Sequence, residues 1–219
     1  MHELGHSIGN LADEYIYYYR AGVDEDAEDD VQIPVPYLIY VGSVQGEPTL
    51  YNVTAATEAQ MVANKIKWWR WIGETSPGLG RVGTFEGGDY YRYGKYRPTD
   101  ESLMRFLGRP FNLPGQEKMI QSFYARITPI ESAPPESQPL DGISPVTIDV
   151  LDPVTHDLTI DWYLDGEVVP SAKNSTTFAF PSGQHSELKV RVVDEMLLVR
   201  NPAWISEYLT EEMVWAIQQ

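Results

Sequence analysis

The stretch HELGHSIGNLADEY, residues 2–15, decides how the N-terminal part of the chain must fold. His2 and His6 are four residues apart, so a helix places both imidazoles on one face, where both can reach one Zn²⁺ ion. Glu3 lies beside them, and its carboxylate can take a proton from a water molecule that the metal activates. The stretch therefore predicts metal-dependent hydrolysis of a carbonyl-centred bond, most often a peptide bond, with Glu3 as the general base.

A third protein ligand is needed, and its place in the sequence requires a chain reversal after His6. Asp13 follows His2 by eleven residues, which on a straight helix would move it about 16 Å along the axis at about 1.5 Å per residue. Zn–O bonds are about 2.0–2.2 Å long, so a straight helix cannot bring Asp13 to the metal. Gly9 is expected to permit the turn, because glycine tolerates positive φ. Glu14 is the rival third ligand, and we favour Asp13 because its shorter side chain has fewer rotamers.

Composition limits the other classes of function. The chain has 219 residues, of which 42% are hydrophobic, enough for one or two domains with a real core. Its 32 acidic residues against 16 basic ones give a formal net charge of −16, which argues against nucleic-acid binding because such a chain repels phosphate backbones. The sequence contains no apolar run long enough to span a membrane. Cysteine is absent, so metal ligands must come from His, Asp and Glu.

Two helices and one irregular segment are expected in the N-terminal part. Residues 58–73 and 115–127 have helical patterns. Trp68 and Trp71 would lie on nearly one face of the first helix, so we expect them to pack in the core. Residues 77–100 hold six glycines and a cluster of tyrosines, which predicts irregular chain around a surface or cleft rather than a regular element.

A proline-rich segment divides the sequence. Residues 129–145 contain five prolines, a composition typical of a semi-stiff linker. We therefore expect a first domain over residues 1–130, a linker over residues 131–144 and a second domain over residues 145–219. Alternating apolar and polar residues beyond the linker predict the short strands of a small β-sandwich, at VTIDVL (146–151), LTIDWYL (158–164), TTFAF (176–180) and ELKVRVV (187–193).

The stretch at residues 2–15 resembles the zinc-site motif of the IgA-peptidase family of bacterial zinc metalloendopeptidases. The likeness continues at KWWRWIG (67–73), FEGGDYYRYGKYRPTDESLMR (85–105) and LKVRVVDE…LVRNP (188–202), and it therefore covers most of the chain in order. The family looks metzincin-like, with a glycine-broken His-Glu-x-x-His helix and a methionine-containing turn beneath the metal. The resemblance implies that Ser102-Leu103-Met104 is this turn and that Met104 packs under the zinc ion as a soft hydrophobic base.

Two positions depart from related patterns. Metzincins generally carry a third histidine ten residues after the first, where this chain has Ala12, with the acid one residue later. Some relatives place a metal-interacting tyrosine two residues after the turn methionine, where this chain has Phe106, which cannot donate a hydrogen bond to a developing oxyanion. The donor then has to come from elsewhere, and the candidates, left unranked, are Tyr90, Tyr91, Tyr93, Tyr96, Arg97 and Arg105.

The resemblance implies an α+β chain, in which the C-terminal part of a truncated, metzincin-like catalytic domain is followed by a small all-β sandwich of the Ig-like or fibronectin-like type. It implies a zinc-dependent endopeptidase with His2, His6 and Asp13 as metal ligands, acting on extracellular protein or peptide substrates that include glycoproteins. We expect a secreted or cell-surface protein whose signal peptide belongs to a region upstream of residue 1. The alternative is a non-catalytic surface, adhesion or binding module that retains a remnant of the metalloprotease half.

The acidic run DEDAEDD, residues 24–30, could bind Ca²⁺ through its carboxylates. It lacks the glycine and the spacing of an EF-hand loop, so we expect a solvated loop instead.

Overall fold

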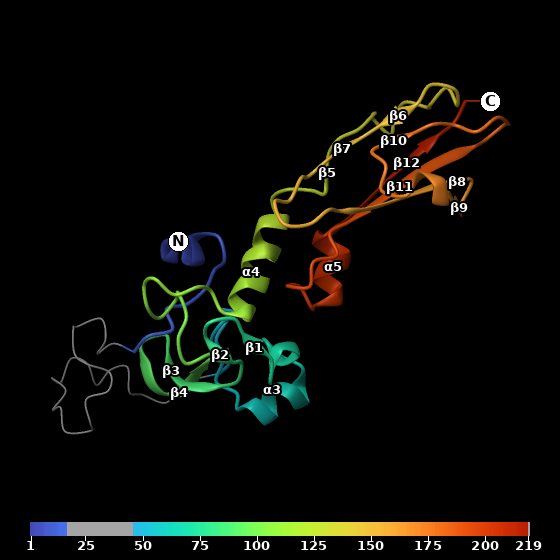
Figure 1. The fold of residues 1–219 in the computed structure, drawn as a ribbon. Coiled ribbons are helices and arrows are strands. Elements are labelled where there is room, and N and C mark those ends of the chain that lie inside the picture. Colours follow the sequence, from blue (N-terminus) through green and yellow to red (C-terminus); the bar gives the residue numbers. More distant parts are fainter. Residues whose placement is uncertain (17–45, 219) are drawn as a thin grey trace, which may run out of the picture. The chain divides into compact units, whose positions relative to one another are not determined.

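The computed structural model describes residues 1–16 and 46–218, and it divides into two compact units, Met1–Ser122 and Phe123–Gln219 (Figure 1). Helices and strands are both present, and the described strands form antiparallel sheets of two or four strands, none of which closes on itself. The α+β class is therefore confirmed. The acidic run at residues 24–30 lies outside the described residues.

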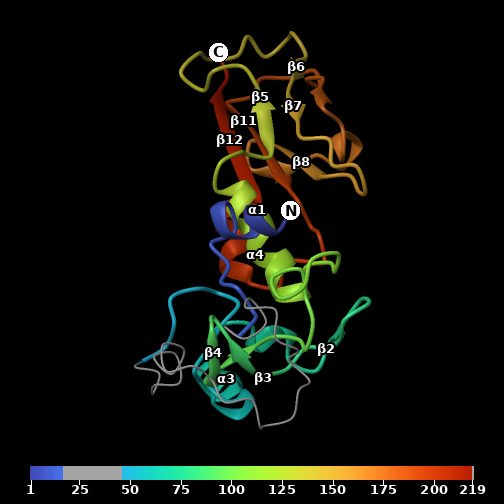
Figure 2. The ribbon, with the colours of Figure 1, turned by 90° about the vertical axis from the view of Figure 1, so that its left-hand side faces the viewer.

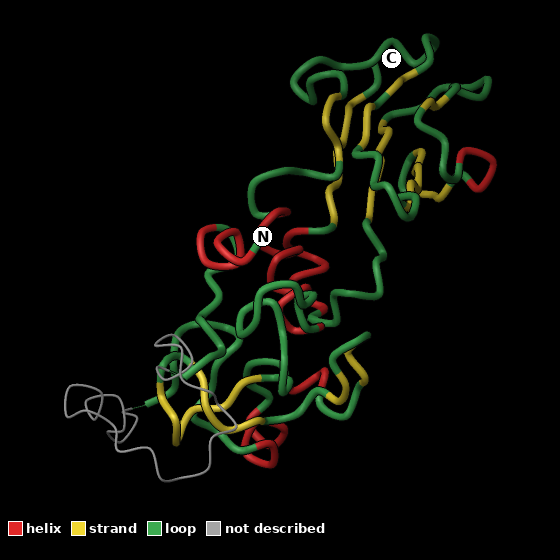
Figure 3. The backbone as a smooth tube through the Cα atoms, turned by 60° about the vertical axis from the view of Figure 1, so that its left-hand side comes forward, coloured by secondary structure: helices red, strands yellow, loops and turns green. Residues whose placement is uncertain are grey.

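In residues 1–16 and 46–122, the first unit consists of short helices and strands joined by loops (Figure 3). Its helices are α1 (His2–Ser7), α3 (Glu58–Asn64), the 3-10 helix η2 (Trp69–Trp71) and α4 (Leu113–Tyr124), the end of which belongs to the second unit. Its strands form two hairpins, β1 (Thr75–Ser76) with β2 (Gly80–Arg81) and β3 (Phe85–Gly88) with β4 (Tyr91–Arg97).

The single helix predicted over residues 58–73 is wrong, because the chain stops being helical after Asn64. Thr57 and Gln60 form a capping box that begins α3, and Lys65 ends it in the left-handed conformation at φ 54°. A separate 3-10 turn follows. Trp68 and Trp71 are nonetheless 0% and 2% exposed, which confirms the expectation that both pack in the core.

The irregular chain predicted over residues 77–100 is also wrong, because this segment contains the β3–β4 hairpin. Gly88 pairs with Tyr91, which leaves Asp89 and Tyr90 as a two-residue turn. Their φ values are 49° and 68°, as a type I′ turn requires at both central positions. A tyrosine is strained where Asn-Gly is the usual choice, so the turn places Tyr90 at a cost in backbone energy.

The second unit contains a four-stranded antiparallel sheet in the order β12-β11-β8-β9, with β11 paired on both sides. Strands β12, β11 and β8 are labelled in Figure 2. Two further strand pairs are β5 with β7 and β6 with β10. The bounds are β5 (Ile130–Ser132), β6 (Val146–Thr147), β7 (Asp149–Val150), β8 (Thr159–Leu164), β9 (Glu167–Val168), η3 (Pro170–Ala172), β10 (Thr177–Phe178), β11 (Glu187–Val193), α5 (Pro202–Tyr208) and β12 (Thr210–Ala216).

One hydrophobic core holds this unit together. Trp162, Phe178, Leu188 and Trp215 are at most 1% exposed and belong to a single cluster to which the sheet and both strand pairs contribute. All four predicted strand segments contain strands, whereas β12 and α5 were not foreseen. That these strands form a β-sandwich, of the Ig-like or fibronectin-like type, stays a prediction.

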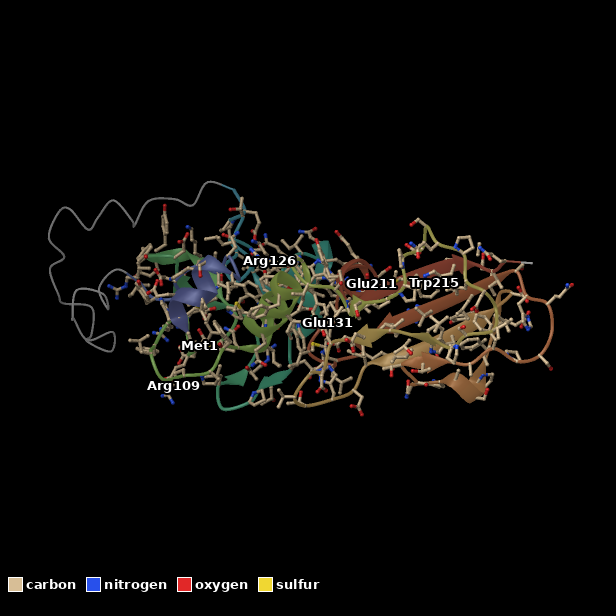
Figure 4. The ribbon with its side chains drawn as sticks, turned by 90° about the horizontal axis from the view of Figure 1, so that it is seen from above. Met1, Arg109, Arg126, Glu131, Glu211 and Trp215 are labelled. Atoms are coloured by element: carbon tan, nitrogen blue, oxygen red, sulfur yellow. The ribbon has the colours of Figure 1, made fainter. Side chains whose placement is uncertain are left out.

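The proline-rich segment lies within the second unit. The Pro134 carbonyl accepts a hydrogen bond of 2.8 Å from Trp215 Nε1, and Glu211 Oε2 accepts one of 2.8 Å from the Ile130 backbone N–H. Arg126, Glu131, Glu211 and Trp215 are labelled in Figure 4. The two compact units meet at residues 122–123, ahead of the prolines, and the linker predicted over residues 131–144 stays a prediction.

Within residues 1–16 and 46–218, no helix has the length and apolar character needed to cross a membrane.

Candidate metal centre

Helix α1 carries His2, Glu3 and His6, and the chain reverses directly after it as predicted. The Asn10 N–H donates to the His6 carbonyl at 3.1 Å, and the Leu11 N–H donates to the Gly5 carbonyl at 3.0 Å. These two bonds turn the following residues back along the helix, so that Asp13 returns to its histidine face.

The predicted reason for Gly9 is wrong. The positive φ of the reversal lies at Asn10, at 48°, and Gly9 is not among the residues with positive φ. Gly9 is needed for space instead, because a Cβ there would lie 2.5 Å from Met119 Sδ and 2.9 Å from the Gly5 carbonyl oxygen. Asparagine tolerates the left-handed conformation better than most residues, so the reversal uses Asn10 for its backbone and Gly9 for its packing.

The structure brings His2, His6 and Asp13 together. His2 Nε2 and His6 Nε2 lie 3.0 and 3.1 Å from Asp13 Oδ1, and 3.1 Å from each other. In the part of the chain that the structure describes, these residues form the one group of three or more His, Asp or Glu side chains close enough to hold a metal ion.

Backbone carbonyls fix the two imidazoles. His2 Nδ1 bonds the Leu103 carbonyl and His6 Nδ1 bonds the Leu11 carbonyl, each at 2.8 Å. A carbonyl only accepts, so each neutral ring carries its proton on Nδ1 and turns an Nε2 lone pair toward Asp13. Three acceptor atoms then converge without a donor between them, an arrangement that a cation stabilises.

The donor atoms fit a zinc ion. A point about 2 Å from all three lies about 1 Å above their plane, which agrees with the usual Zn–N and Zn–O lengths and leaves the fourth tetrahedral direction open. The Asp13 side chain is only 7% exposed, so its negative charge is largely removed from water. A bound cation would compensate that charge.

Two tyrosines support Asp13. The Tyr90 hydroxyl donates to Asp13 Oδ2, on the side of the carboxylate away from the atom that faces the histidines. Tyr15 packs edge-on against Tyr90 at 5.4 Å between ring centroids. Burial, and then hydrogen bonds with Tyr90 and Asp13, raise the pKa of Tyr15 far above its usual value, so this hydroxyl keeps its proton.

Glu14, the rival ligand, points elsewhere. It is 1% exposed and accepts hydrogen bonds from Asn52 Nδ2 at 2.9 Å, from the Ser102 hydroxyl at 2.5 Å and from Asn112 Nδ2 at 3.2 Å. Burial raises its pKa. Glu14 thus ties the chain after the reversal to the core.

Asn52 was not foreseen as a supporting residue. Its side chain is fully buried and bonds both the N–H and the carbonyl of Ala12, at 2.7 and 2.9 Å. It therefore holds the backbone on one side of Asp13, while its bond to Glu14 holds the other. No local signal in the sequence marks a contact between residues 40 positions apart.

The turn at residues 102–104 packs directly against α1. A Cβ on Gly5 would lie 2.4 Å from Met104 Sδ, and Met104 is 1% exposed. Its carbonyl accepts from the Glu14 N–H at 2.8 Å, while the Leu103 carbonyl orients His2. One turn therefore supports the helix from below and positions two parts of the site.

An open pocket of about 420 Å³ lies over the triad. Glu3 is exposed and lines it, next to His2 on the same turn of α1. The pocket is lined by His2, Glu3, His6, Leu11, Ala12, Asp13, Tyr15, Leu50, Asp89 and Tyr90.

Of the six candidate oxyanion donors, Tyr90 alone lines this pocket. Arg97 instead bonds the carbonyls of Glu86 and Gly87, at 2.6 and 2.8 Å, and Arg105 bonds Asp100. Tyr93 is half-exposed on β4. Tyr91 and Tyr96 are also on β4, where they pair with Gly88 and Glu86 of β3. Tyr90 in turn already donates to Asp13.

A second pocket, of about 590 Å³, shares His2 with the first. Its lining is largely apolar and consists of Met1, His2, Leu103, Leu107, Gly108, Arg109, Pro110, Phe111 and Gln116. Met1 and Arg109 are labelled in Figure 4. The triad thus lies between a polar and an apolar depression.

Comparison with known proteins gives one family. Residues 78–123 match the family described as IgA Peptidase M64, a stretch that includes the β3–β4 hairpin, Met104 and most of α4 but not the triad. No curated protein matches the chain. Part of the chain is therefore similar to this peptidase family, which supports a peptidase function.

Proposed function

We propose that the chain is a zinc-dependent endopeptidase that hydrolyses peptide bonds of extracellular proteins. The observation that carries this proposal is the convergence of His2 Nε2, His6 Nε2 and Asp13 Oδ1, 3.0–3.1 Å apart, under an open pocket that Glu3 also lines. The family match at residues 78–123 supports the peptidase class independently, because it does not include these three residues.

A zinc ion, when bound, would supply a Lewis acid that polarises the scissile carbonyl and lowers the pKa of water to about 7. His2, His6 and Asp13 would hold it. Glu3 accepts the proton of the attacking water and passes it to the leaving amine. Its exposure at the pocket suits this role, since the general base must reach both the water and the substrate.

The two depressions that meet at His2 support a protein substrate. An extended peptide whose scissile bond lies at the triad would place a side chain in the apolar pocket beside Leu103 and Phe111. The acidic chain, with its formal net charge of −16, disfavours polyanionic substrates.

Three further parts of the proposal follow from the resemblance to the IgA-peptidase family. They are a metzincin-like catalytic fold around α1 and the Met104 turn, an Ig-like or fibronectin-like class for the second unit, and secretion or display at the cell surface. Glycoproteins are among the substrates that this setting would offer.

The proposal is tested with the full chain and its Glu3→Gln variant, both purified without a histidine tag. We expect about one zinc ion per chain in both proteins by mass spectrometry. We expect the wild type to cleave unfolded protein substrates, and Glu3→Gln to cleave them at least about 100-fold more slowly. Ser7→Ala, an exposed change on the same helix, is the matched control.

Zinc retained by Glu3→Gln together with lost proteolysis supports the general-base assignment. A folded wild-type chain without zinc would overturn the proposal and favour the non-catalytic binding module. Equal cleavage by wild type and Glu3→Gln would overturn the role of Glu3.

A further inference from the structure

The two oxygens of the Asp13 carboxylate have different surroundings. Oδ1 faces His2 Nε2 and His6 Nε2 at 3.0 and 3.1 Å, whereas Oδ2 accepts the hydroxyl proton of Tyr90. A free carboxylate can bind a metal with one oxygen or with both. The hydrogen bond to Tyr90 distinguishes the two oxygens before any metal arrives.

Two backbone hydrogen bonds hold Tyr90 beside Asp13. The Asp89 N–H donates to the Asp13 carbonyl at 2.7 Å, and the Tyr90 N–H donates to the Tyr15 carbonyl at 3.1 Å. The turn of the β3–β4 hairpin is therefore hydrogen-bonded to the backbone of the loop segment that carries Asp13. Tyr90 adopts a positive φ of 68° to make this contact, a conformation in which a tyrosine is strained and glycine is not.

Tyr15 contacts the Tyr90 ring and also forms hydrogen bonds with Tyr90 and Asp13. The two rings meet edge to face, at 5.4 Å between centroids and 75° between planes. Both residues line the pocket over the triad. This contact therefore restrains the change of χ1 that would carry the Tyr90 hydroxyl away from Asp13.

We propose that Tyr90, backed by Tyr15, is a positioning residue that occupies Asp13 Oδ2 and so makes Asp13 a metal ligand through Oδ1 alone. This inference rests on the proposed zinc site. A carboxylate bound through both oxygens would fill a coordination position that a hydrolytic site needs for water and substrate. Hydrogen bonds to the far side of a ligand also hold it in the orientation that binding requires.

The test measures metal binding rather than proteolysis, on the full chain and its Tyr90→Phe variant. Zinc affinity is measured by competition with a chromophoric chelator, and coordination is monitored by the visible absorption of the Co²⁺-substituted proteins. We expect Tyr90→Phe to bind zinc about 10- to 100-fold more weakly. Its Co²⁺ absorption should weaken, because a second Asp13 oxygen raises the coordination number and tetrahedral Co²⁺ absorbs most strongly.

Two further variants make the result specific. Tyr93→Phe removes an exposed hydroxyl on the same hairpin and should leave affinity and spectrum unchanged. Tyr90→Gly relieves the positive φ while removing the phenol, so a folded Tyr90→Gly protein should show the same loss of affinity even where Tyr90→Phe folds poorly.

The outcomes separate this inference from the function on which it rests. If the wild type binds zinc and Tyr90→Phe matches it in affinity and Co²⁺ spectrum, the positioning role is wrong while the zinc site stands. If the folded wild type binds no zinc, both are wrong. Weaker binding with an altered Co²⁺ spectrum, absent in Tyr93→Phe, supports the inference.

Discussion

Gly5 and Gly9 determine how closely α1 approaches the chain that supports it. A Cβ would lie 2.4 Å from Met104 Sδ at Gly5 and 2.5 Å from Met119 Sδ at Gly9. The two thioethers and Leu11 form one buried cluster beneath the helix. The close approach of α1 to the returning chain, and with it the position of Asp13, therefore requires that Gly5 and Gly9 have no Cβ atom.

Gly9→Ala is expected to lower the free energy of unfolding of the first unit by about 1–3 kcal/mol, because the added methyl group overpacks the cluster. Part of the clash is with the Gly5 carbonyl at 2.9 Å, which cannot move aside as a side chain can. Urea unfolding measures the change. Ser7→Ala, on the exposed side of α1, should shift stability by less than about 0.5 kcal/mol, and an equally small effect of Gly9→Ala would refute the packing argument.

The ligands could be predicted from the sequence because their spacing is local and chemically distinctive. His2, His6 and Asp13 lie within twelve residues, and the need for a reversal follows from helix geometry alone. Tyr90 contacts Asp13 across 77 positions and Asn52 contacts Ala12 across 40, so no spacing rule reveals either. The reversal was predicted, but its positive φ was assigned to Gly9 when Asn10 adopts it.

At the scale of elements, two hairpin turns have different roles. Asp89-Tyr90 carries a functional side chain into the pocket, whereas Asp165-Gly166 joins β8 to β9 with φ values of 51° and 85°. Asp165 also anchors the start of β11, because its Oδ1 accepts from the Ser186 N–H and hydroxyl, each at 2.7 Å. These bonds, with one from His185, lower the pKa of Asp165.

Because the folded-state pKa of Asp165 is depressed, its contribution to stability is present above the ordinary value of 3.8 and is lost as the pH falls below it. Asp165→Asn cannot lose a charge there. We expect the wild type to be more stable than Asp165→Asn at about pH 6, with the difference shrinking toward about pH 3. Urea unfolding followed by tryptophan fluorescence measures this, and a difference that does not depend on pH would rule out the carboxylate as its source.

Elements were predicted best where hydrophobic alternation and burial agree. Strand β8 buries Ile160, Trp162 and Leu164, and its alternation is plain in the sequence. The helix predicted across residues 58–73 ends at Asn64, because Lys65 adopts a left-handed conformation. Lysine is not a residue type that predicts this conformation. Strand β12 was not predicted, because glutamate residues such as Glu211 and Glu212 are uncommon in strands. In the structure β11 pairs with it along its whole length.

At the scale of the whole molecule, the two units have separate cores. The large cluster around Trp162 and Trp215 lies within residues 123–219, and the clusters around Trp68 and Met104 lie within residues 1–122. The triad and the residues that support it belong to the first unit alone. Metal binding should therefore tolerate damage to the second core.

Leu188→Ala should destabilise the second unit by about 2–5 kcal/mol, because Leu188 is fully buried in the central strand β11. Zinc affinity should stay at its wild-type value. Urea unfolding and chelator competition test the two statements, with the exposed Glu187→Ala as the control. A parallel loss of zinc affinity would show that the site depends on the second unit.

The proposed function requires that His2, His6 and Asp13 bind one zinc ion together. Calorimetric titration of zinc into the metal-free chain tests it, with His6→Ala, Asp13→Ala and Glu14→Gln measured alongside. We predict one site per chain that His6→Ala and Asp13→Ala weaken severely and that Glu14→Gln, which keeps both metal-facing imidazoles and Asp13, weakens far less. Tight binding that survives Asp13→Ala but is lost in a folded Glu14→Gln protein would show that Glu14, and not Asp13, is the third ligand.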